Sequence, residues 1–452
     1  MVTFLPARPG RLADVPSFTR AIGGAESNVA CALAAAGHRT KWVGRVGRDG
    51  FGEHLVAAIG AYGVDVSAVT RDPERPTGVY FRTATDRASE AHEVVYYRAG
   101  SAASAMSPAT VPYAEVSGGR ILHLSGITAA LSASCLALVR ALTAARGARP
   151  LVSFDVNFRP VLWGDAGRGG QVLLELARGA DLVFVGADEA EAAWGVGEPE
   201  AIRALLPEPA VLVVKRGAEG AVVFERGADT ARPAGTPGTR ASTGPVGDAG
   251  RGADPGAAAG RSRDAGPVAG AGRGPGPGPG PGPGPGPDTG HGTEAGHGTG
   301  TDPEAGRGPG AGRGPEAGGG PYTGSGGDAG RGPGAGPVAG PGASRGTGPG
   351  PGGRPDAVHV VPAPRVDVVA PVGAGDAFAA GFLSGTLRGL GTVARARHGH
   401  LMAAAALTVP GDLAVPARRA RADLLAALDD RAWETLHLGP GWTGDDQEVR
   451  TS

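Results

Sequence analysis

Short apolar runs alternate with helical patterns over most of the chain, on both sides of a long polar stretch. Apolar runs of about five residues are typical of strands buried on both faces, whereas apolar positions spaced three or four apart favour helices. We predict helices over residues 25–36, 52–61, 132–146 and 376–387, and strands over residues 41–46, 77–83, 93–98, 121–124, 151–155, 181–185, 211–214, 221–225 and 358–361. This alternation predicts a doubly wound α/β fold with a mostly parallel sheet, in which ligands bind beyond the carboxyl ends of the strands.

Residues 229–355 break the pattern. Gly and Pro alternate strictly from Gly274 to Pro287, and large aliphatic or aromatic residues are almost absent throughout the stretch. Such a segment cannot bury enough apolar surface to offset its conformational entropy, and its period of two excludes collagen. We expect a disordered insertion that joins the strands over 221–225 and 358–361. A tolerated repeat expansion is favoured over a regulatory or partner-binding arm.

Charge and cysteine content narrow the class of protein. The 452 residues have a formal net charge of -1, so nothing attracts nucleic acid or a membrane surface in general. Two cysteines, Cys31 and Cys135, are too few for a disulfide framework, and they lie outside any zinc-like cluster. Apolar runs stay well short of the roughly 20 residues that span a membrane, and the N-terminus does not resemble a signal peptide. We therefore expect a cytoplasmic protein.

The segment with the clearest chemistry is PVGAGDAFAAGFL, from Pro371 to Leu383. Gly373, Ala374 and Gly375 predict a turn of small residues that opens directly into a helix. Free backbone N–H groups at such a turn bind anions, and phosphate oxygens can approach because side chains do not block them. Asp376 follows at the first helical turn, where a carboxylate either caps the helix or accepts a proton from an attacking hydroxyl.

Four segments in order carry a resemblance to a known family. They are GGAESNVACALAAAG (23–37), GRVGRDGFG (44–52), VVKRGAEGA (213–221) and DVVAPVGAGDAF (367–378). Together they resemble the signatures of the ribokinase-like (PfkB) carbohydrate kinases, over nearly all of the chain outside the insertion. The resemblance implies transfer of a phosphoryl group from ATP, with Mg²⁺, to a sugar hydroxyl, and it makes Asp376 the catalytic base beside the anion-binding Gly373, Ala374 and Gly375.

Three further segments narrow the substrate. YYRAGSAAS (96–104), HLSGI (123–127) and FDVNFRPVLW (154–163) resemble 2-keto-3-deoxygluconate kinases, although fructokinases share the last pattern. The planar fork of arginine binds carboxylates at two points. Arg98, with Arg159 opposite, would therefore select an acidic sugar over a neutral one.

The resemblance assigns roles to individual residues. It implies sugar contacts by Gly24, Asn28, Tyr80, Tyr96, Arg98, Arg159 and Asp412. It implies an ATP site lined by Asn157, Lys215, Gly217, Gly220, Gly373 and Gly375, and a magnesium ion ordered through water by Glu189. Each polar assignment has a purely structural alternative: a solvated strand position for Arg98, packing for Tyr96, a helix cap for Asn28, a strand flank for Lys215, a surface helix for Glu189 and a loop for Asp412.

We predict four parts of the chain: residues 1–228 and 356–438 form the kinase domain, 229–355 the insertion and 439–452 a flexible tail. A small β lid comes from segments near 1–20 and 77–104 and closes over the sugar, and lids of this type pair across homodimers. The first residues, MVTFLPARPG, resemble the segment after the first family strand, so we expect a native start upstream of Met1.

The alternatives are a fructokinase or another sugar kinase of the family and, in a different class, a sugar-binding protein without catalytic activity. We expect small-molecule partners only, a sugar acid and ATP, with no nucleic acid and no membrane. The sequence leaves the physiological sugar and the oligomeric state open.

Overall fold

The computed structural model describes residues 1–8, 10–83, 94–144, 149–164, 166–226, 356–444 and 450–451. The chain divides into a unit formed by Met1–Pro233 with Thr347–Ser452 and a second unit, Ala234–Gly346. All described residues belong to the first unit. The predicted insertion, 229–355, lies outside the described residues.

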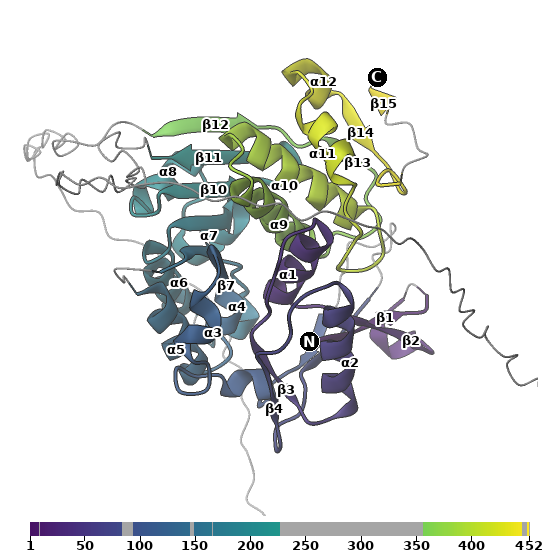
Figure 1. Cartoon of the computed structure of the whole chain (residues 1–452), viewed down its shortest axis with the longest axis vertical. Coiled ribbons are helices and arrows are strands. Elements are labelled where there is room, and N and C mark those ends of the chain that lie inside the picture. The colour runs from purple at the N-terminus through teal and green to yellow at the C-terminus, as the bar shows by residue number, and fades with distance from the viewer. Residues whose placement is uncertain are drawn as a thin grey trace, which may run out of the picture. The chain divides into compact units, whose positions relative to one another are not determined.

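A six-stranded sheet forms the centre of this unit (Figure 1). Its strands in spatial order are β12 (Ala357–Val361), β11 (Ala221–Glu225), β10 (Val211–Lys215), β9 (Leu182–Gly186), β8 (Leu151–Asp155) and β7 (Ile121–Ser125). Strands β7 to β10 run parallel, while β11 pairs antiparallel with both β10 and β12. Glu225 pairs with Ala357, so the insertion leaves and re-enters the sheet at neighbouring positions. A loop between such close ends costs little extra entropy as it lengthens.

Helices cover both faces of the sheet, as Figure 1 shows. The helices that matter for the site are α1 (Ala25–Ala35), α5 (Ala133–Thr143), α6 (Ala166–Arg178), α7 (Ala187–Trp194), α9 (Ala374–Leu387) and α10 (Thr392–Leu407). Alternate side chains of a strand point to opposite faces. On β9, Val183 and Val185 therefore pack with α5 and α6, whereas Leu182 and Phe184 pack with α1, α9 and α10. The predicted doubly wound α/β fold is confirmed.

Aromatic packing fixes the helix that carries the Gly373–Asp376 turn. Phe184 of β9 is fully buried, and its ring meets Phe378 and Phe382 edge-on at centroid distances of 6.3 and 5.5 Å. Phe378 and Phe382 are four residues apart, so they lie on one face of α9. Since Phe378 follows Asp376 by two residues, this contact holds the first turn of α9 against the carboxyl end of the sheet.

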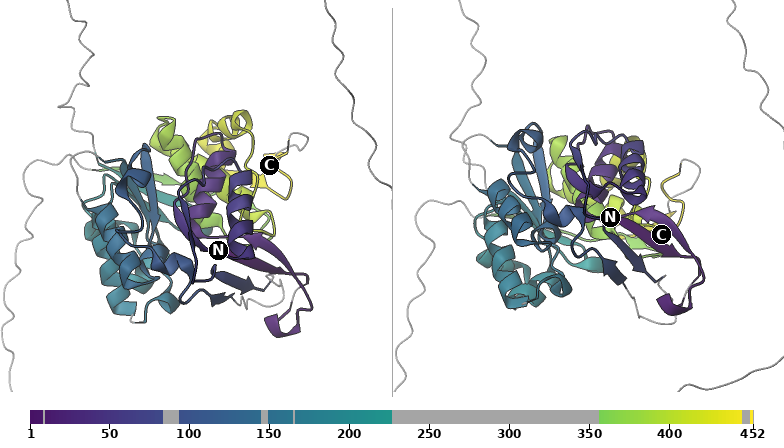
Figure 2. Two further views of the ribbon diagram at one scale, coloured as in Figure 1. Left: turned by 60° about the horizontal axis from the view of Figure 1, so that its bottom comes forward. Right: turned by 90° about the horizontal axis from the view of Figure 1, so that it is seen from below.

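A separate four-stranded sheet forms the lid. Its order is β2 (Phe18–Ile22), β1 (Val2–Pro6), β5 (Val79–Arg82) and β6 (Val94–Tyr97). Figure 2 shows its purple strands projecting away from the helices that cover the central sheet. Along β5, Tyr80 and Arg82 are buried, whereas the alternate residue Phe81 stacks on Phe4 of β1 on the opposite face. The predicted lid, drawn from both segments, is present.

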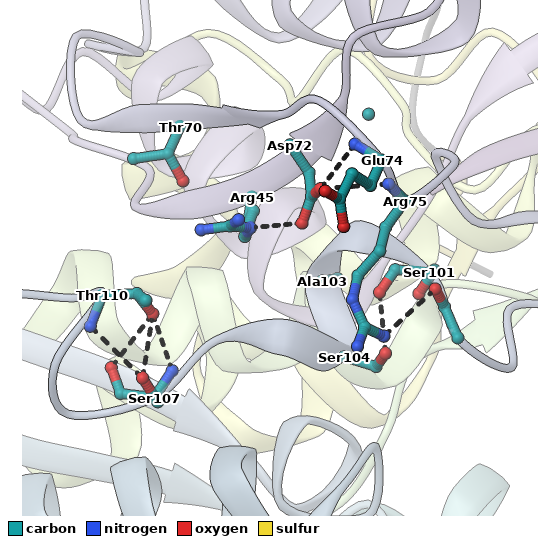
Figure 3. Close-up of polar contacts among 12 residues, drawn as sticks. Arg45, Thr70, Asp72, Glu74, Arg75, Ser101, Ala103, Ser104, Ser107 and Thr110 are labelled. Carbon is teal, nitrogen blue, oxygen red and sulfur yellow. Dashed lines mark hydrogen bonds and ion pairs between the residues drawn. The ribbon is translucent and has the colours of Figure 1, made fainter.

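Polar contacts hold the connections at the base of the lid (Figure 3). Asp72 ends β4 (Val69–Asp72), which pairs with β3 (Gly44–Gly47). Its carboxylate accepts from the backbone N–H groups of Glu74 and Arg75 at 3.0 Å and from Arg45 Nε at 2.8 Å. These hydrogen bonds lower the pKa of Asp72 to about 2, and the N–H of Glu74 has the largest effect. Burial of the carboxylate acts in the opposite direction, and the N–H of Arg75 and the Arg45 side chain lower the pKa further. The segment that enters β5 is thereby fixed to the α/β body.

The remaining described elements lie outside the central sheet and the lid sheet. They are the helices α2 (Gly50–Ala61), α3 (Tyr113–Ser117), α4 (Gly126–Ala129), α8 (Pro199–Leu205), α11 (Arg419–Ala426) and α12 (Asp430–Glu434), the 3₁₀ turns Leu12–Asp14, Ala102–Ala105, Pro160–Leu162 and Gly217–Glu219, and the strands β13 (Arg365–Val366), β14 (Leu436–Leu438) and β15 (Arg450–Thr451). Within the described ranges, none of the helices is long and apolar enough to cross a membrane.

The C-terminal segment corrects one prediction. Trp442 is only 3% exposed and belongs to an apolar cluster with Trp433 and Leu438. Burial of a tryptophan is a large gain in apolar area. The expectation of a flexible tail is therefore wrong for residues 439–444, where Trp442 packs into this apolar cluster.

Candidate active site

A cavity of about 1670 Å³ lies where the lid faces the carboxyl ends of the central strands. Its lining combines lid strands, the first turn of α1, the ends of β8 and β10 and the turn before α9. Among the predicted site residues, it is lined by Gly24, Asn28, Tyr80, Tyr96, Arg98, Asn157, Arg159, Glu189, Lys215, Gly373, Ala374, Gly375, Asp376 and Asp412. Two predicted nucleotide residues, Gly217 and Gly220, do not line it. The topology thus gathers almost all of the predicted site into one space.

The turn at Gly373–Gly375 has the geometry of an anion site. Gly373 precedes α9 with φ of 78°, a left-handed conformation that favours glycine, and a Cβ there would clash with the carbonyl oxygen of Asp412. Ala377 N donates to Gly373 O at 2.9 Å, so helical bonding begins at that carbonyl. The first N–H groups of α9 therefore have no partner within the helix and carry the positive end of its dipole.

Asp376 lies in that first turn and faces the cavity. Asn28 Nδ2, from α1, donates to its Oδ2 at 2.8 Å. Burial is the largest effect on this carboxyl and raises its pKa to about 7, the hydrogen bond from Asn28 acting in the opposite direction. A carboxylate with a pKa near neutrality can accept a proton from a hydroxyl at physiological pH.

Two pairs of opposite charge occupy the strand ends next to this turn. Lys215 Nζ, at the end of β10, lies 3.1 Å from both carboxylate oxygens of Asp155, at the end of β8. Arg159 Nη1 lies 2.8 Å from Glu189 Oε1. Burial alone would lower the pKa of Lys215, but Asp155 and Glu189 outweigh it and raise that pKa, so the amine stays charged. Its position beside Gly375 puts a fixed positive charge next to the anion turn.

Comparison with known proteins agrees with this geometry. The model of the pfkB family of carbohydrate kinases matches residues 2–253 and 354–418, well over half of the chain. The chain belongs to the pfkB family of carbohydrate kinases. The gap in the match, 254–353, falls inside the predicted insertion.

Individual relatives of this carbohydrate kinase differ in their sugar. It is 37% identical to a 2-dehydro-3-deoxygluconokinase of Thermoproteus tenax over 229 residues, which are 50% of this chain and 70% of the relative. It is 31% identical to fructokinase-1 of Oryza sativa over 230 residues, 50% of this chain and 71% of the relative. A sugar kinase of Pyrococcus horikoshii, solved in complex with ATP, shares the fold with a TM-score of 0.57 at 17% identity, covering 93% of this chain and 94% of that one.

The lid side of the kinase cavity carries a second arginine. Arg98 follows β6, and its guanidinium lies 5.9 Å from the ring centroid of Tyr96. Burial lowers the pKa of Arg98, and its buried Nε has no hydrogen-bond partner within the described ranges. The Glu26 carboxylate, in the first turn of α1, acts on the pKa of Arg98 in the opposite direction and raises it, and Thr128 donates to Glu26 at 2.5 Å.

Three predicted positions have a backbone role in the kinase. Asn157 has φ of 43°, the only positive φ of a non-glycine residue among those described, directly beyond β8. Such strain concentrates at functional sites, which agrees with its prediction as a site residue. Gly217 and Gly220 form the turn between β10 and β11, and Gly220 has φ of 113° with the carbonyl of Val361 where a Cβ would lie. Their geometry supports the turn rather than a wall of the cavity.

Several polar residues of the cavity were not predicted, and three of them contact or neighbour predicted site residues. Asp155 holds Lys215, Glu26 faces the cavity from α1, and Arg82 reaches Asp412 from the lid. Asp155 and Glu26 stand inside the quoted signature segments, so their position beside Asn157 and Asn28 was a usable signal. Arg82 had no such signal, because its partner lies more than 300 residues away along the chain.

The family implies magnesium, and the side chains present fit it only in part. Among the described residues, no group of three His, Cys, Asp or Glu side chains could hold a metal ion. Glu189 accepts from Arg159 with one carboxylate oxygen and from the N–H of Gly186, at 3.1 Å, with the other. Magnesium in kinases is held largely by the substrate phosphates and water, with one or two carboxylates. Both carboxylate oxygens of Glu189 thus have protein partners, and the described residues form no protein cage for a metal ion.

Proposed function

We propose that this kinase transfers the γ-phosphoryl group of ATP to the 6-hydroxyl of 2-keto-3-deoxygluconate. The observation that carries the sugar assignment is Arg98, a half-buried residue of the cavity lining whose buried Nε has no hydrogen-bond partner among the described residues. A buried donor without a partner costs free energy, and a carboxylate of the substrate would remove that cost. The 37% identity to a 2-dehydro-3-deoxygluconokinase, against 31% to a fructokinase, supports the same sugar.

The proposed mechanism follows from three fixed groups. The N–H groups at the start of α9 and the charge of Lys215 hold the negative oxygens of the transferring phosphoryl group. Asp376, with a pKa of about 7, accepts the proton of the attacking hydroxyl. Asn28 holds the Asp376 carboxylate by its 2.8 Å hydrogen bond, so that one oxygen remains for the substrate.

ATP and Mg²⁺ are the proposed co-substrate and metal. The relative from Pyrococcus horikoshii binds ATP, and the anion turn of this chain supports the same donor. Magnesium supplies neutralisation of the phosphate charge, and Glu189 would contact it through water. Asn157 and Lys215 line the proposed nucleotide side, where the lid would exclude water that would otherwise hydrolyse ATP. Arg159, predicted as a sugar contact opposite Arg98, donates to Glu189 in the same cavity.

We also propose a homodimer formed through the outer face of the lid. Phe4, Phe18, Phe81 and Tyr97 form an aromatic cluster there, with ring centroids 4.7 to 5.9 Å apart. Tyr97 is 64% exposed, which is unusual for a ring at the end of such a cluster. Analytical ultracentrifugation of Tyr97→Asp should give monomers where the natural chain gives dimers. A natural chain that sediments as a monomer would contradict the dimer.

We propose the cytoplasm as its compartment. Both cysteines, Cys31 and Cys135, are buried free thiols, which agrees with a reducing environment.

The deciding test is a substrate panel. ADP release would be measured with magnesium and ATP against 2-keto-3-deoxygluconate, fructose, ribose and gluconate, for the natural chain and for Asp376→Asn. We expect the highest kcat/KM for the keto acid and loss of turnover in the variant. A preference for fructose or ribose would keep the kinase and refute the acid pocket. Thermal stabilisation by a sugar without turnover would instead support a non-catalytic sugar-binding protein.

A further inference from the structure

A carboxylate and a guanidinium of the cavity act on each other electrostatically but form no pair among the described residues. Glu26, in the first turn of α1, and Arg98, which follows β6, both line the cavity. Burial lowers the pKa of Arg98, and the charge of Glu26 has the next largest effect and raises it. Within the described ranges, Arg98 nevertheless has no ion-pair partner, and its buried Nε has no hydrogen-bond partner. Two opposite charges are thus close enough to interact without a direct contact.

Other cations of the same lining are paired with carboxylates. Lys215 Nζ lies 3.1 Å from both carboxylate oxygens of Asp155, and Arg159 Nη1 lies 2.8 Å from Glu189 Oε1. The fork of an arginine readily binds a carboxylate at two points when one is within reach. A carboxylate that lies near Arg98 and leaves it unpaired must therefore be held by another group.

Thr128 supplies the contact that holds Glu26. Its hydroxyl donates to Glu26 Oε1 at 2.5 Å, a length typical of a charge-assisted hydrogen bond between a hydroxyl and a carboxylate. Thr128 belongs to α4, and this helix is closely packed, since a Cβ on Gly126 would lie 2.2 Å from the carbonyl oxygen of Val156. The hydroxyl therefore cannot follow Glu26 if the carboxylate turns toward Arg98.

Arg98 is restrained from the lid. Its guanidinium lies 5.9 Å from the ring centroid of Tyr96, and its Cβ lies 3.3 Å from the position that a Cβ on Gly78 would take. A cation over an aromatic ring is attracted to the face of that ring. The two opposite charges are thus held by different elements, Glu26 by α4 and Arg98 by the lid.

We propose that Thr128 is a positioning residue that keeps Glu26 from pairing with Arg98, so that the guanidinium stays available to the carboxylate of an acidic sugar. An internal pair would compete with the substrate, because only enzyme molecules with a free Arg98 could bind that carboxylate. The apparent affinity of a ligand falls in proportion to the fraction of molecules that are competent to bind it. This role rests on the proposed acidic sugar and adds the residue that keeps its pocket open.

The first test compares Thr128→Val with the natural full-length chain, using 2-keto-3-deoxygluconate and fructose. Valine keeps the shape of threonine and removes the hydroxyl, so Glu26 becomes free to pair with Arg98. If about nine in ten molecules form that pair, KM for the keto acid should rise about tenfold, while kcat and the KM for fructose stay within about threefold. Thr128→Ala should act like Thr128→Val, and Thr128→Ser should retain the natural KM. An unchanged KM for the keto acid in both variants without the hydroxyl, or an equal rise for both sugars, would overturn the proposal.

A double-mutant cycle identifies Glu26 as the competitor. Glu26→Gln keeps an acceptor for Thr128 but removes the charge that would pair with Arg98. The effect of Thr128→Val on KM should therefore be lost when Glu26→Gln is already present, and additive effects would contradict competition by Glu26. Thr435→Val is the matched control and should leave both KM values unchanged, because Thr435 lies outside the cavity lining and its hydroxyl donates to the Arg431 carbonyl.

A crystal structure of Thr128→Val without sugar tests the restraint independently of the substrate. Glu26 should lie within about 4 Å of the Arg98 guanidinium, the usual limit of an ion pair. A Glu26 side chain that stays in its natural position would overturn the proposal, whichever sugar the enzyme prefers. A natural chain that prefers fructose, together with a pair between Glu26 and Arg98 in the variant, would confirm the restraint and refute the acidic sugar instead.

Discussion

The cationic side chains at the two proposed ends of the cavity differ in their hydrogen-bond partners. At the proposed phosphate end, Lys215 is paired with Asp155 at 3.1 Å, and Arg159, which was predicted opposite Arg98 in the sugar pocket, is paired with Glu189 at 2.8 Å. At the sugar end, the buried Nε of Arg98 has no hydrogen-bond partner in the part of the chain that the structure describes. The two cations of the first group each have a carboxylate within hydrogen-bond distance, whereas the Nε donor of Arg98 does not.

This difference separates general catalytic parts from those that select the substrate. Charges fixed by protein partners need no rearrangement during reaction, which suits a phosphoryl group that every kinase of the family must bind. An unpaired buried donor penalises any ligand that cannot satisfy it, so it discriminates strongly between substrates. Changes at the phosphate end should therefore reduce turnover of every sugar, and changes at Arg98 should alter the choice among sugars.

The largest effect is expected where the two ends meet, at Asp376. Asp376→Asn removes the base but keeps the shape and the contact with Asn28, so kcat should fall by about 10²–10⁴-fold with every sugar. Binding of ATP, measured by calorimetry, should change little. Asp188→Asn, in the first turn of α7 and outside the cavity lining, is the matched control. A variant with natural kcat would remove Asp376 from the mechanism.

Asp155→Asn should remove the negative charge that pairs with Lys215 at the proposed phosphate end. Lys215 would lose its nearest partner, and removing one member of a buried pair costs about 3–5 kcal/mol of unfolding free energy. The displaced amine should also lower kcat by about 10²-fold for acidic and neutral sugars alike. Chemical denaturation and kinetics with two sugars would measure both effects. A loss confined to one sugar would contradict the division between the ends.

The phosphate end was also the more predictable part of the sequence. Gly373, Ala374, Gly375 and Asp376 are consecutive, and local backbone chemistry alone gives a small-residue turn before a helix. The strands were predicted for a similar reason, and β8 and β11 have the predicted bounds. Two corrections arise there, because α9 begins at Ala374 instead of residue 376, and Gly217 and Gly220 do not line the cavity.

Contacts between distant residues could not be predicted in this way. Tyr80 and Asp412 are 332 positions apart, and no local sequence pattern indicates that the Tyr80 hydroxyl donates to the Asp412 carboxylate. Lys215 and Asp155 meet because they end parallel strands β10 and β8, on either side of β9. The predicted strand over 151–155 ends at Asp155, and Lys215 follows the predicted strand over 211–214. The sequence alone does not indicate that these two side chains form a pair.

Arg98→Gln should reduce the preference of the enzyme for an acidic sugar over a neutral one. Hydrogen bonds to charged groups are worth about 1.5–3 kcal/mol, so kcat/KM for 2-keto-3-deoxygluconate should fall roughly 10- to 100-fold. For fructose, which has no carboxylate, kcat/KM should stay within about threefold. Initial rates with the two sugars, at natural and variant enzymes, give the ratio directly. Equal losses for both would assign Arg98 to packing against Tyr96 instead of to recognition.

The smallest expected effect is a shift in pH dependence at Asn28. The reaction needs the deprotonated form of Asp376, so kcat/KM should rise with pH and level off above about 7. The Asn28 amide stabilises the charged carboxylate, and its removal in Asn28→Ala should raise the pKa of Asp376 further. The variant should therefore lose activity a few-fold at pH 6 and match the natural enzyme at high pH.

The raised pKa of Asp376 also determines how the free energy of unfolding changes with pH. Because the pKa of Asp376 is higher in the folded chain than in the unfolded chain, ionisation opposes folding, and stability from this group falls as pH rises to about 7. Asn28→Ala should deepen that fall and extend it to higher pH. Ser27→Ala is the matched control, since the Ser27 hydroxyl bonds to the Gly24 carbonyl instead of to Asp376. An unshifted pH limb in Asn28→Ala would mean that a group other than Asp376 sets the profile, which would place the proton acceptor elsewhere in the cavity.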